Sequence, residues 1–290
     1  VSALTILGLI PRPPGEIAGG KILFHGRNLL ELGEEEMQKI RGSRIAMVFQ
    51  EPMTSLNPVF TVGDQIKEAI LVHEHMGKAE LQERCLQLLR DVGIPSPEER
   101  INDYPHQLSG GQRQRVMIAM ALACNPDLVI ADEPTTALDV TIQRQILNLF
   151  ARLQKKRGMS LLYITHDLNV VSNIADRIYV MYAGSIAEQG ATATIFGDAR
   201  HPYTMGLLAS LPHRSKRGGT LHSIPGTVPD AAFRPPGCPF HPRCGYAIDT
   251  CRTVFPELCD FGDGHLSRCP VLYARRDNHE DTKGRKHEKE

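Results

Sequence analysis

The chain has 290 residues, 41% of them hydrophobic, so it is long enough and apolar enough to bury a folded core and is not wholly disordered. Lysine plus arginine equals aspartate plus glutamate at 33 each, so no overall basic charge favours a nucleic-acid partner. No apolar stretch reaches the length of a membrane span, and Val1–Ile10 lacks the positive leader of a signal peptide. If the protein serves a membrane, it does so from the surface.

Gly15–Lys21 has the spacing of a phosphate-binding loop, Gly-x-x-x-x-Gly-Lys-Ser/Thr, as far as the lysine. Ile22 stands where the magnesium-binding hydroxyl belongs, and prolines precede the segment in place of a buried strand. Lys21–Phe24 continues as a strand where the motif requires a helix. We therefore predict a turn in an antiparallel β region.

Two short apolar runs are typical of buried parallel strands and end in polar residues. Ile45–Phe49 leads to Gln50, and Leu128–Ala131 leads to Asp132 and Glu133. Adjacent carboxylates are usually a solvated surface feature, but a preceding run of four apolar residues argues against that interpretation. Strands of this kind deliver polar groups to the mouth of an α/β sheet.

Residues 62–105 are predicted to be mainly helical, and the segment after Ser109 opens a further helix that Asn125 and Pro126 end. Cys85 and Cys124 are interpreted as small core residues. The expected buried positions at helical spacing are Leu81, Cys85, Leu88 and Leu89 in the first region and Val116, Ala119, Met120 and Ala123 in the second.

Asp139 is a candidate N-cap for a helix that ends at Gly158. Its expected apolar face consists of Ile142, Ile146, Leu149, Phe150 and Leu153. A further buried strand, Leu161–Thr165, leads to His166.

The segment Leu108–Arg115, Leu-Ser-Gly-Gly-Gln-Arg-Gln-Arg, followed by the carboxylate-bearing strand Leu128–Pro134, resembles the signature and magnesium-binding strand of ATP-binding cassette (ABC) ATPases. The resemblance implies an α/β fold: a P-loop NTPase-like core of a mixed sheet flanked by helices over residues 1–195. It also implies an α-helical subdomain at about 57–108.

The same resemblance implies roles for individual residues. Asp132 holds Mg²⁺ through water, Gln50 touches Mg²⁺ and the attacking water, Glu133 orients or deprotonates that water, and His166 senses the γ-phosphate of ATP. The signature residues bind ATP held by the opposite subunit, and Ala137–Asp139 resembles the loop that crosses the dimer interface. The implied nucleotide-binding residues are Asp132, Ser109, Gly110, Gly111, Gln112 and Asp139.

In the family, a phosphate-binding loop precedes a helix that Val1–Ile10 resembles, so the chain is expected to begin just after that loop. This puts ATP binding by the printed chain in question and says less about the intact gene product.

Three segments resemble the peptide-importer and nickel-importer branch of the family: Glu51–Pro58, His201–Thr204 and Ile224–Pro229. They imply a C-terminal extension over 196–273. The implied partners are a second ABC ATPase subunit, identical or paralogous, two membrane permease subunits and, indirectly, a peptide-binding protein, with no nucleic acid. The implied location is peripheral, at the cytoplasmic face of the membrane.

Five of the seven cysteines lie from Cys238 to Cys269. Their spacing fits neither a common zinc-finger pattern nor a ferredoxin run, so it does not choose between zinc, an iron–sulfur cluster and free thiols or disulfides. Some dipeptide-importer ATPases carry a [4Fe–4S] cluster on four tail cysteines. The matching residues here are Cys238, Cys244, Cys251 and Cys269.

Residues 274–290 are charged and nearly free of apolar side chains, which is typical of a disordered tail. The expected function is an ATPase subunit that couples ATP binding and hydrolysis to peptide import. The alternatives are a soluble ABC ATPase acting on ribosomes or DNA, and a non-hydrolysing cassette that completes a partner's ATP site.

Overall fold

The computed structural model describes residues 1–50, 55–136, 138–211 and 223–274. The chain divides into two compact units, Val1–His166 and Asp167–Glu290. This boundary lies earlier than residue 195, where we expected the first domain to end. The reason is that the strands following Asp167 pair with C-terminal strands of their own unit.

The centre of the first unit is a parallel sheet with the strand order β3-β4-β5. Its strands are β3 (Ile45–Val48), β4 (Leu128–Asp132) and β5 (Ser160–Ile164). The structure confirms the three apolar runs as strands. The expected burial holds for most of β3 and β4 but not for β5, whose side chains are half-buried or, at Ser160, exposed. Asp132 lies opposite Ile164 in the register, so the loops that follow β3, β4 and β5 leave from the same edge.

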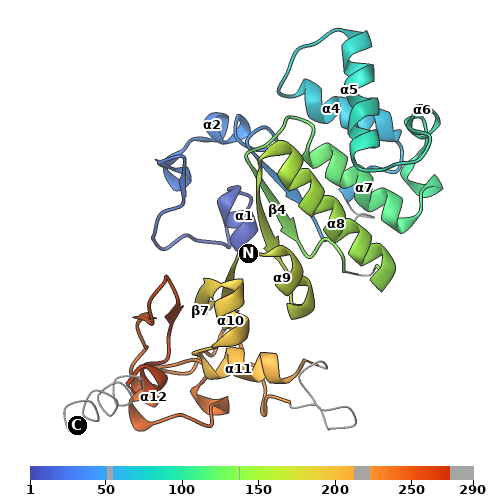
Figure 1. The fold of residues 1–290 in the computed structure, drawn as a ribbon. Helices are drawn as coiled ribbons and strands as arrows, with labels where there is room; N and C mark the ends of the chain where they lie inside the picture. The colour runs from blue at the N-terminus through green and yellow to red at the C-terminus, as the bar shows by residue number, and fades with distance from the viewer. Residues whose placement is uncertain (51–54, 137, 212–222, 275–290) are drawn as a thin grey trace, which may run out of the picture. The chain divides into compact units, whose positions relative to one another are not determined.

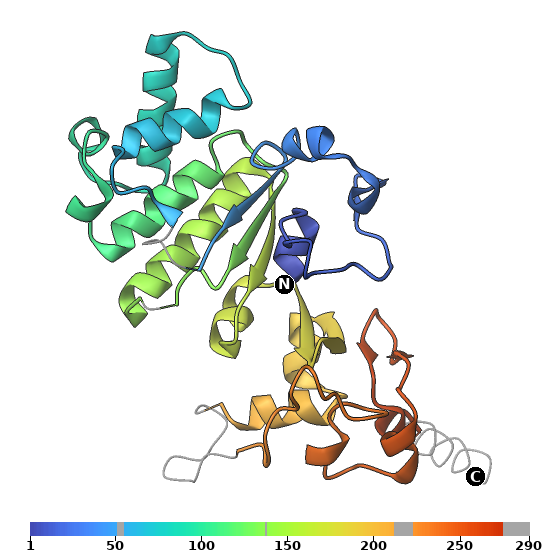
Figure 2. The ribbon, with the colours of Figure 1, turned by 180° about the vertical axis from the view of Figure 1, so that it is seen from behind.

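Helices cover both faces of this sheet, as an all-parallel sheet requires. Figures 1 and 2 show α7 (Gly110–Ala121) and α8 (Val140–Arg157) on one side and α1 (Ser2–Ile6) on the other. Ala3 packs with Ile45 and Ile130 in one buried cluster. On the opposite face Phe150 of α8 meets Tyr163 edge-on, with ring centroids 6.1 Å apart.

The segment between α1 and β3 is built of short elements. β1 (Leu23–Phe24) and β2 (Arg27–Asn28) form an antiparallel hairpin, followed by η1 (Leu29–Glu31) and α2 (Glu34–Gln38). No helix follows Lys21, so the prediction of a turn leading into antiparallel β structure is confirmed.

The region between β3 and the signature is helical, as the periodicity predicts. Its elements are α4 (Val62–Leu71), α5 (Lys78–Asp91), α6 (Pro97–Arg100) and η2 (Pro105–Gln107). The predicted stripe on α5, Leu81, Cys85, Leu88 and Leu89, is buried. On α7 we expected Met120 to be buried. Its side chain is only half-buried, because it faces a groove rather than the core.

The second unit contains a four-stranded antiparallel sheet in the order β6-β7-β9-β8. We expected one mixed sheet; over the described ranges the parallel and antiparallel strands lie in separate sheets. The elements are α9 (Leu168–Ile174), β6 (Arg177–Tyr182), β7 (Ser185–Ala191), α10 (Thr192–Gly197), α11 (Pro202–Ala209), η3 (His241–Arg243), α12 (Asp249–Thr253), β8 (Cys259–Asp260) and β9 (Leu266–Ser267).

Three expectations fall outside the described residues: the first half of the Glu51–Pro58 loop, Ala137, and the charged tail beyond residue 274. Among the helices that the structure describes, none combines the length and apolarity needed to cross a membrane.

Candidate functional site

Three of the predicted site residues meet at the carboxyl edge of the parallel sheet. The Gln50 side-chain amide donates to Glu133 Oε2 over 3.1 Å, and His166 Nδ1 lies 3.1 Å from Glu133 Oε1. These side chains follow β3, β4 and β5, whose carboxyl ends share one edge. Strand topology therefore brings together residues that are far apart in the sequence.

Glu133 is the centre of this cluster. Its backbone has a φ of 47°, in the left-handed region that a non-glycine residue seldom adopts, directly after the end of β4. The hydrogen bond from His166 lowers the pKa of the Glu133 carboxyl, a second from the Thr136 hydroxyl lowers it further, and partial burial opposes both. The carboxylate is therefore ionised at neutral pH, and a carboxylate only accepts hydrogen bonds. It can accept a proton from a water molecule placed beside it.

Asp132 is the last residue of β4 and is half-buried. The described part of the chain gives its carboxylate no hydrogen-bond or ion-pair partner. The magnesium roles expected for Gln50 and Asp132 stay predictions; in this structure the Gln50 amide donates to Glu133. An unpaired carboxylate beside this cluster has the chemistry of a water-mediated Mg²⁺ ligand, since Mg²⁺ keeps several waters and takes one or two carboxylates.

The signature begins α7. Ser109 is the N-cap: its hydroxyl oxygen accepts from the Gln112 backbone N–H over 3.3 Å, and the Gln112 side chain accepts from the Ser109 backbone N–H over 2.9 Å. This reciprocal capping box fixes the first turn. The hydroxyl hydrogen of Ser109 remains available to donate to an anion at the positive end of the helix dipole.

The two signature glycines lie against the start of α8. A Cβ at Gly111 would stand 2.9 Å from Ile142 Cγ2, and a Cβ at Gly110 would stand 3.8 Å from Leu138. Asp139, in the same segment, caps α8 by accepting from the Ile142 N–H over 2.9 Å. Gly111 is therefore required for close packing against α8.

Within the described residues, no hydrogen bond links the Ser109 side chain to Glu133, Gln50 or His166. The expected role of the signature at an ATP site on an opposite subunit stays a prediction. The sequence did not indicate that the Thr136 hydroxyl donates a hydrogen bond to the Glu133 carboxylate. Nor did it single out Gln114, which is fully buried on α7 with both amide atoms lacking partners among the described residues.

A groove of about 540 Å³ opens elsewhere on the first unit. Its walls come from the end of α1, from β3, from α4 and from α7. Many lining side chains are flexible or apolar: Leu7, Leu9, Met47, Phe49, Met117 and Met120. Methionine-rich surfaces adapt to the partner that they contact.

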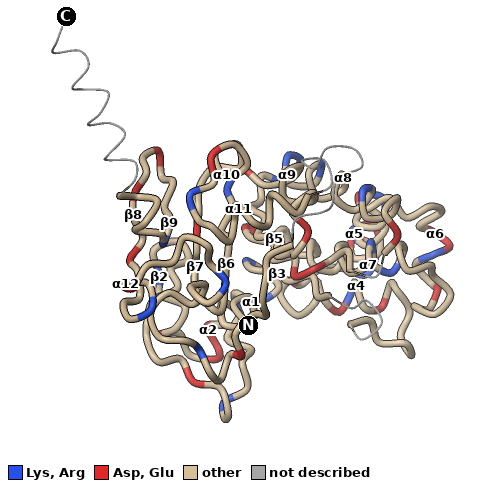
Figure 3. Tube along the Cα trace, turned by 90° about the horizontal axis from the view of Figure 1, so that it is seen from below, with Lys and Arg blue, Asp and Glu red and all other residues tan. Residues whose placement is uncertain are grey.

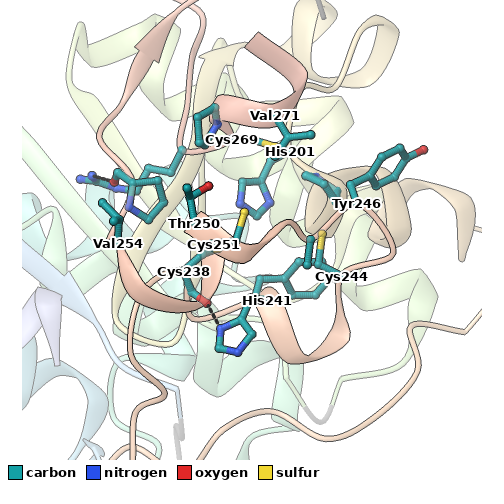
Figure 4. A pocket seen from close by; sticks show the side chains of 16 residues that line it. His201, Cys238, His241, Cys244, Tyr246, Thr250, Cys251, Val254, Cys269 and Val271 are labelled. Carbon is teal, nitrogen blue, oxygen red and sulfur yellow. Dashed lines mark hydrogen bonds between the residues drawn. The ribbon is translucent and has the colours of Figure 1, made fainter. Parts of the chain in front are cut away.

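In the second unit, Cys238, Cys244, Cys251 and Cys269 line one cavity of about 290 Å³ (Figure 4). Cys259 does not line it. Burial raises the pKa of the Cys238, Cys244 and Cys269 thiols, in the last case to about 11. Each of these three pKa values is raised further by other cavity cysteines, so the thiols lie within electrostatic range of one another.

No group of three or more His, Cys, Asp or Glu side chains in the described ranges is arranged to hold a metal ion. The expected cluster ligands are therefore gathered around a common cavity without forming a preassembled ion site.

Comparison with known proteins agrees with this geometry. Residues 4–136 match the ABC transporter family, and residues 187–251 match the C-terminal region of oligopeptide/dipeptide transporters. A probable peptide ABC transporter ATP-binding protein of Sinorhizobium fredii is 52% identical over 93% of this chain and 81% of its own length. The dipeptide transport ATP-binding protein DppD of Escherichia coli is also 52% identical, over 93% and 82%.

Among solved structures, the ATP-binding cassette MJ0796 in a dimeric post-hydrolysis state with ADP and phosphate matches with a TM-score of 0.54 and 31% identity, over 60% of this chain and 74% of that one. CbiO1 of Clostridium perfringens, part of an ABC transporter complex, matches with a TM-score of 0.59 and 29% identity, over 67% and 73%. The chain belongs to the ABC ATPase family, among the ATP-binding proteins of peptide transporters.

Proposed function

We propose that this protein is the ATPase subunit of an importer of dipeptides or oligopeptides, and that ATP binding and hydrolysis drive the transport. The convergence of Gln50 and His166 on Glu133 carries the proposal. The relatives are peptide and dipeptide transport ATP-binding proteins, and they supply the cargo class.

In the proposed mechanism Glu133 accepts the proton of the attacking water, and the Gln50 amide orients that water. Gln50 and Asp132, the latter through water, would hold Mg²⁺, and His166 would respond to the γ-phosphate. When bound, Mg²⁺ would supply the positive charge that phosphoryl transfer requires. Phosphoryl transfer depends on positioning and charge neutralisation more than on covalent chemistry, which suits a site built of a carboxylate, an amide and an imidazole.

A second ABC ATPase subunit, identical or paralogous, completes the proposed ATP site. Ser109, Gly110, Gly111 and Gln112 would bind the γ-phosphate of ATP on the opposite subunit, and Asp139 would lie at the interface. The dimeric state of MJ0796 with ADP and phosphate gives a precedent in a related fold.

Two permease subunits are the proposed membrane partners, and the methionine-lined groove is their proposed docking surface. This places the subunit peripherally, at the cytoplasmic face of the membrane, with a peptide-binding protein as an indirect partner. Lys and Arg are interspersed with Asp and Glu along the described trace, a pattern that does not favour nucleic acid (Figure 3). This distribution and the peptide-transport relatives disfavour action on ribosomes or DNA.

The proposed domains are an ATPase core over 1–195, with a helical subdomain at about 57–108, and a cysteine-bearing extension over 196–273. We further propose that Cys238, Cys244, Cys251 and Cys269 hold a [4Fe–4S] cluster. The donor set suits it: four thiols surround one cavity, whereas a single zinc ion requires ligands gathered tightly around one point. When bound, such a cluster supplies one-electron redox chemistry or structural cross-linking.

Transport by the intact gene product tests the proposed function. We expect ATP-dependent uptake of a labelled dipeptide into proteoliposomes that contain this subunit, its partner ATPase and two permeases, with the peptide-binding protein added outside. Uptake that is unaffected by omission of this subunit would contradict the proposal. ATP hydrolysis by the partner alone, with this subunit needed only for binding, would instead support the non-hydrolysing alternative.

A further inference from the structure

His201 forms part of the wall of the cysteine cavity (Figure 4). It is the N-cap residue of α11 and is only 3% exposed. A buried polar residue is expected to have hydrogen-bond partners for its side chain. The partners of this imidazole determine which of its two nitrogens carries the hydrogen.

The backbone at His201 is fixed by Glu188, a fully buried carboxylate on β7. Glu188 Oε2 accepts from the His201 backbone N–H over 3.1 Å, and Oε1 accepts from the backbone N–H of Arg200. His265 holds this carboxylate in turn, with Nε2 2.7 Å from Glu188 Oε1. The position of His201 is therefore set by a buried network and not by the cavity.

The hydrogen bonds of His201 assign its neutral tautomer. Nδ1 accepts from the Tyr203 backbone N–H over 3.1 Å, so Nδ1 carries no hydrogen and the ring hydrogen is on Nε2. Phe240 packs against the ring, with centroids 5.9 Å apart. Within the part of the chain that the structure describes, the hydrogen bond of the His201 ring is at Nδ1, so the Nε2–H remains available to donate.

His241, the other histidine of the cavity wall, has the opposite arrangement. Its Nδ1 lies 2.9 Å from the Cys238 carbonyl oxygen, which can only accept. The neutral His241 ring therefore has its hydrogen on Nδ1, and its Nε2 is an acceptor. Of these two imidazoles, only His201 offers an N–H donor that is not already used.

We propose that His201 donates its Nε2–H to a sulfur atom of the iron–sulfur cluster bound by the four cavity cysteines. The inference rests on the cluster proposed above and assigns His201 as a positioning residue, not a ligand. Hydrogen bonds to cluster sulfurs are among the factors that set reduction potential. Because such a bond stabilises the more negative, reduced state, His201 raises the potential of the cluster.

The test uses the intact gene product, reconstituted anaerobically with ferrous iron and sulfide. Iron and sulfide content is measured first, and the midpoint potential is then determined by dithionite titration followed by electron paramagnetic resonance. His201→Asn keeps an N-cap acceptor for α11, since Asn is a favoured cap, but its side chain is too short to place an amide N–H at the position of His201 Nε2. Tyr246→Phe, which removes a hydroxyl from the same cavity wall and keeps the ring, is the control.

We expect a more negative midpoint for His201→Asn at unchanged iron and sulfide content, and a wild-type midpoint for Tyr246→Phe. An Asn variant that holds the cluster and titrates like wild type would overturn the His201 inference and leave the cluster standing. Wild-type protein that binds no iron and sulfide would overturn both. If the Asn variant loses the cluster, wild-type protein with ¹⁵N-labelled histidine decides: nitrogen coupling to the reduced cluster supports the bond, and its absence refutes it.

Discussion

His166 and Glu133 form a hydrogen-bonded pair in which the imidazole Nδ1 lies 3.1 Å from a carboxylate oxygen. The His166 side chain is 76% exposed, whereas that of Glu133 is 26% exposed. The exposed imidazole thus covers a more protected carboxylate. A ligand that contacts the exposed side of the His166 ring can change the hydrogen bond between His166 and Glu133 without contacting Glu133 itself.

Glu133→Gln removes the proton-accepting oxygen and keeps the size of the side chain. We expect ATP turnover by the intact gene product to fall by roughly 10²- to 10⁴-fold, the usual contribution of a general base, while ATP binding persists. Turnover is measured as phosphate release at saturating ATP. Glu35→Gln, on the surface of α2 and remote from β4 in sequence, is the control and should retain turnover. Equal turnover in the two variants would exclude Glu133 as the base.

The location of these residues could be predicted because each follows an apolar run long enough to be a strand, whereas their choice as site residues came from the resemblance to ABC ATPases. Gln50, Glu133 and His166 all occupy the first or second position after such a run. Parallel pairing then guarantees that they share an edge. The hydrogen bonds among them could not be predicted, because they depend on side-chain rotamers and on the left-handed backbone at Glu133.

Asp91, at the end of α5, was not predicted, although it joins α5 to α8. Its carboxylate accepts from Lys156 and from Arg157, each over 2.8 Å, and its side chain is only 7% exposed. Burial alone would raise the pKa of Asp91, but the hydrogen bonds from Lys156, Arg157 and Gln87 outweigh burial and lower it to about 2.

Asp91→Asn tests this junction. A pKa lowered from 3.8 to about 2 corresponds to about 2 kcal/mol of stability. Because the folded-state pKa is depressed, this contribution is fully present above the unfolded value and is lost as the pH falls through the folded value. Urea unfolding should therefore show a deficit of about 2 kcal/mol at pH 7 that shrinks below pH 4. A deficit that stays constant down to pH 2 would show that the charge is not its cause.

The division between the two units could not be predicted either, because it depends on pairing between segments that are distant in the sequence. The sequence of Arg177–Ala191 does not indicate whether this hairpin extends the parallel sheet or belongs to a second sheet. Its partner, β9 (Leu266–Ser267), has only two residues and no strand signal of its own. Glu188 is a charged residue in a strand, yet it is fully buried because its partners come from distant segments.

Ser109→Asp separates the two roles of the signature serine. Asp is as good an N-cap as Ser, so we expect the stability of the subunit to change by no more than about 0.5 kcal/mol. The added carboxylate should repel the γ-phosphate, and ATP-dependent dimerisation in a Glu133→Gln background should be lost. Light scattering with and without ATP measures this. Thr61→Asp changes the cap of α4, which makes the same kind of bond, and should still dimerise. A Ser109→Asp protein that dimerises normally would show that the signature does not contact phosphate.

Met120→Glu tests the groove on the first unit. Met120 is half-buried and lines the groove with Met47 and Met117, so a glutamate there would place a charge against an apolar partner surface. We expect affinity for the permease subunits to fall at least about tenfold, which corresponds to about 1.4 kcal/mol. Binding to permeases in detergent or nanodiscs measures the effect. Met205→Glu is the matched control, because Met205 is exposed on α11 in the second unit. If both variants bind permeases equally well, the docking surface lies elsewhere.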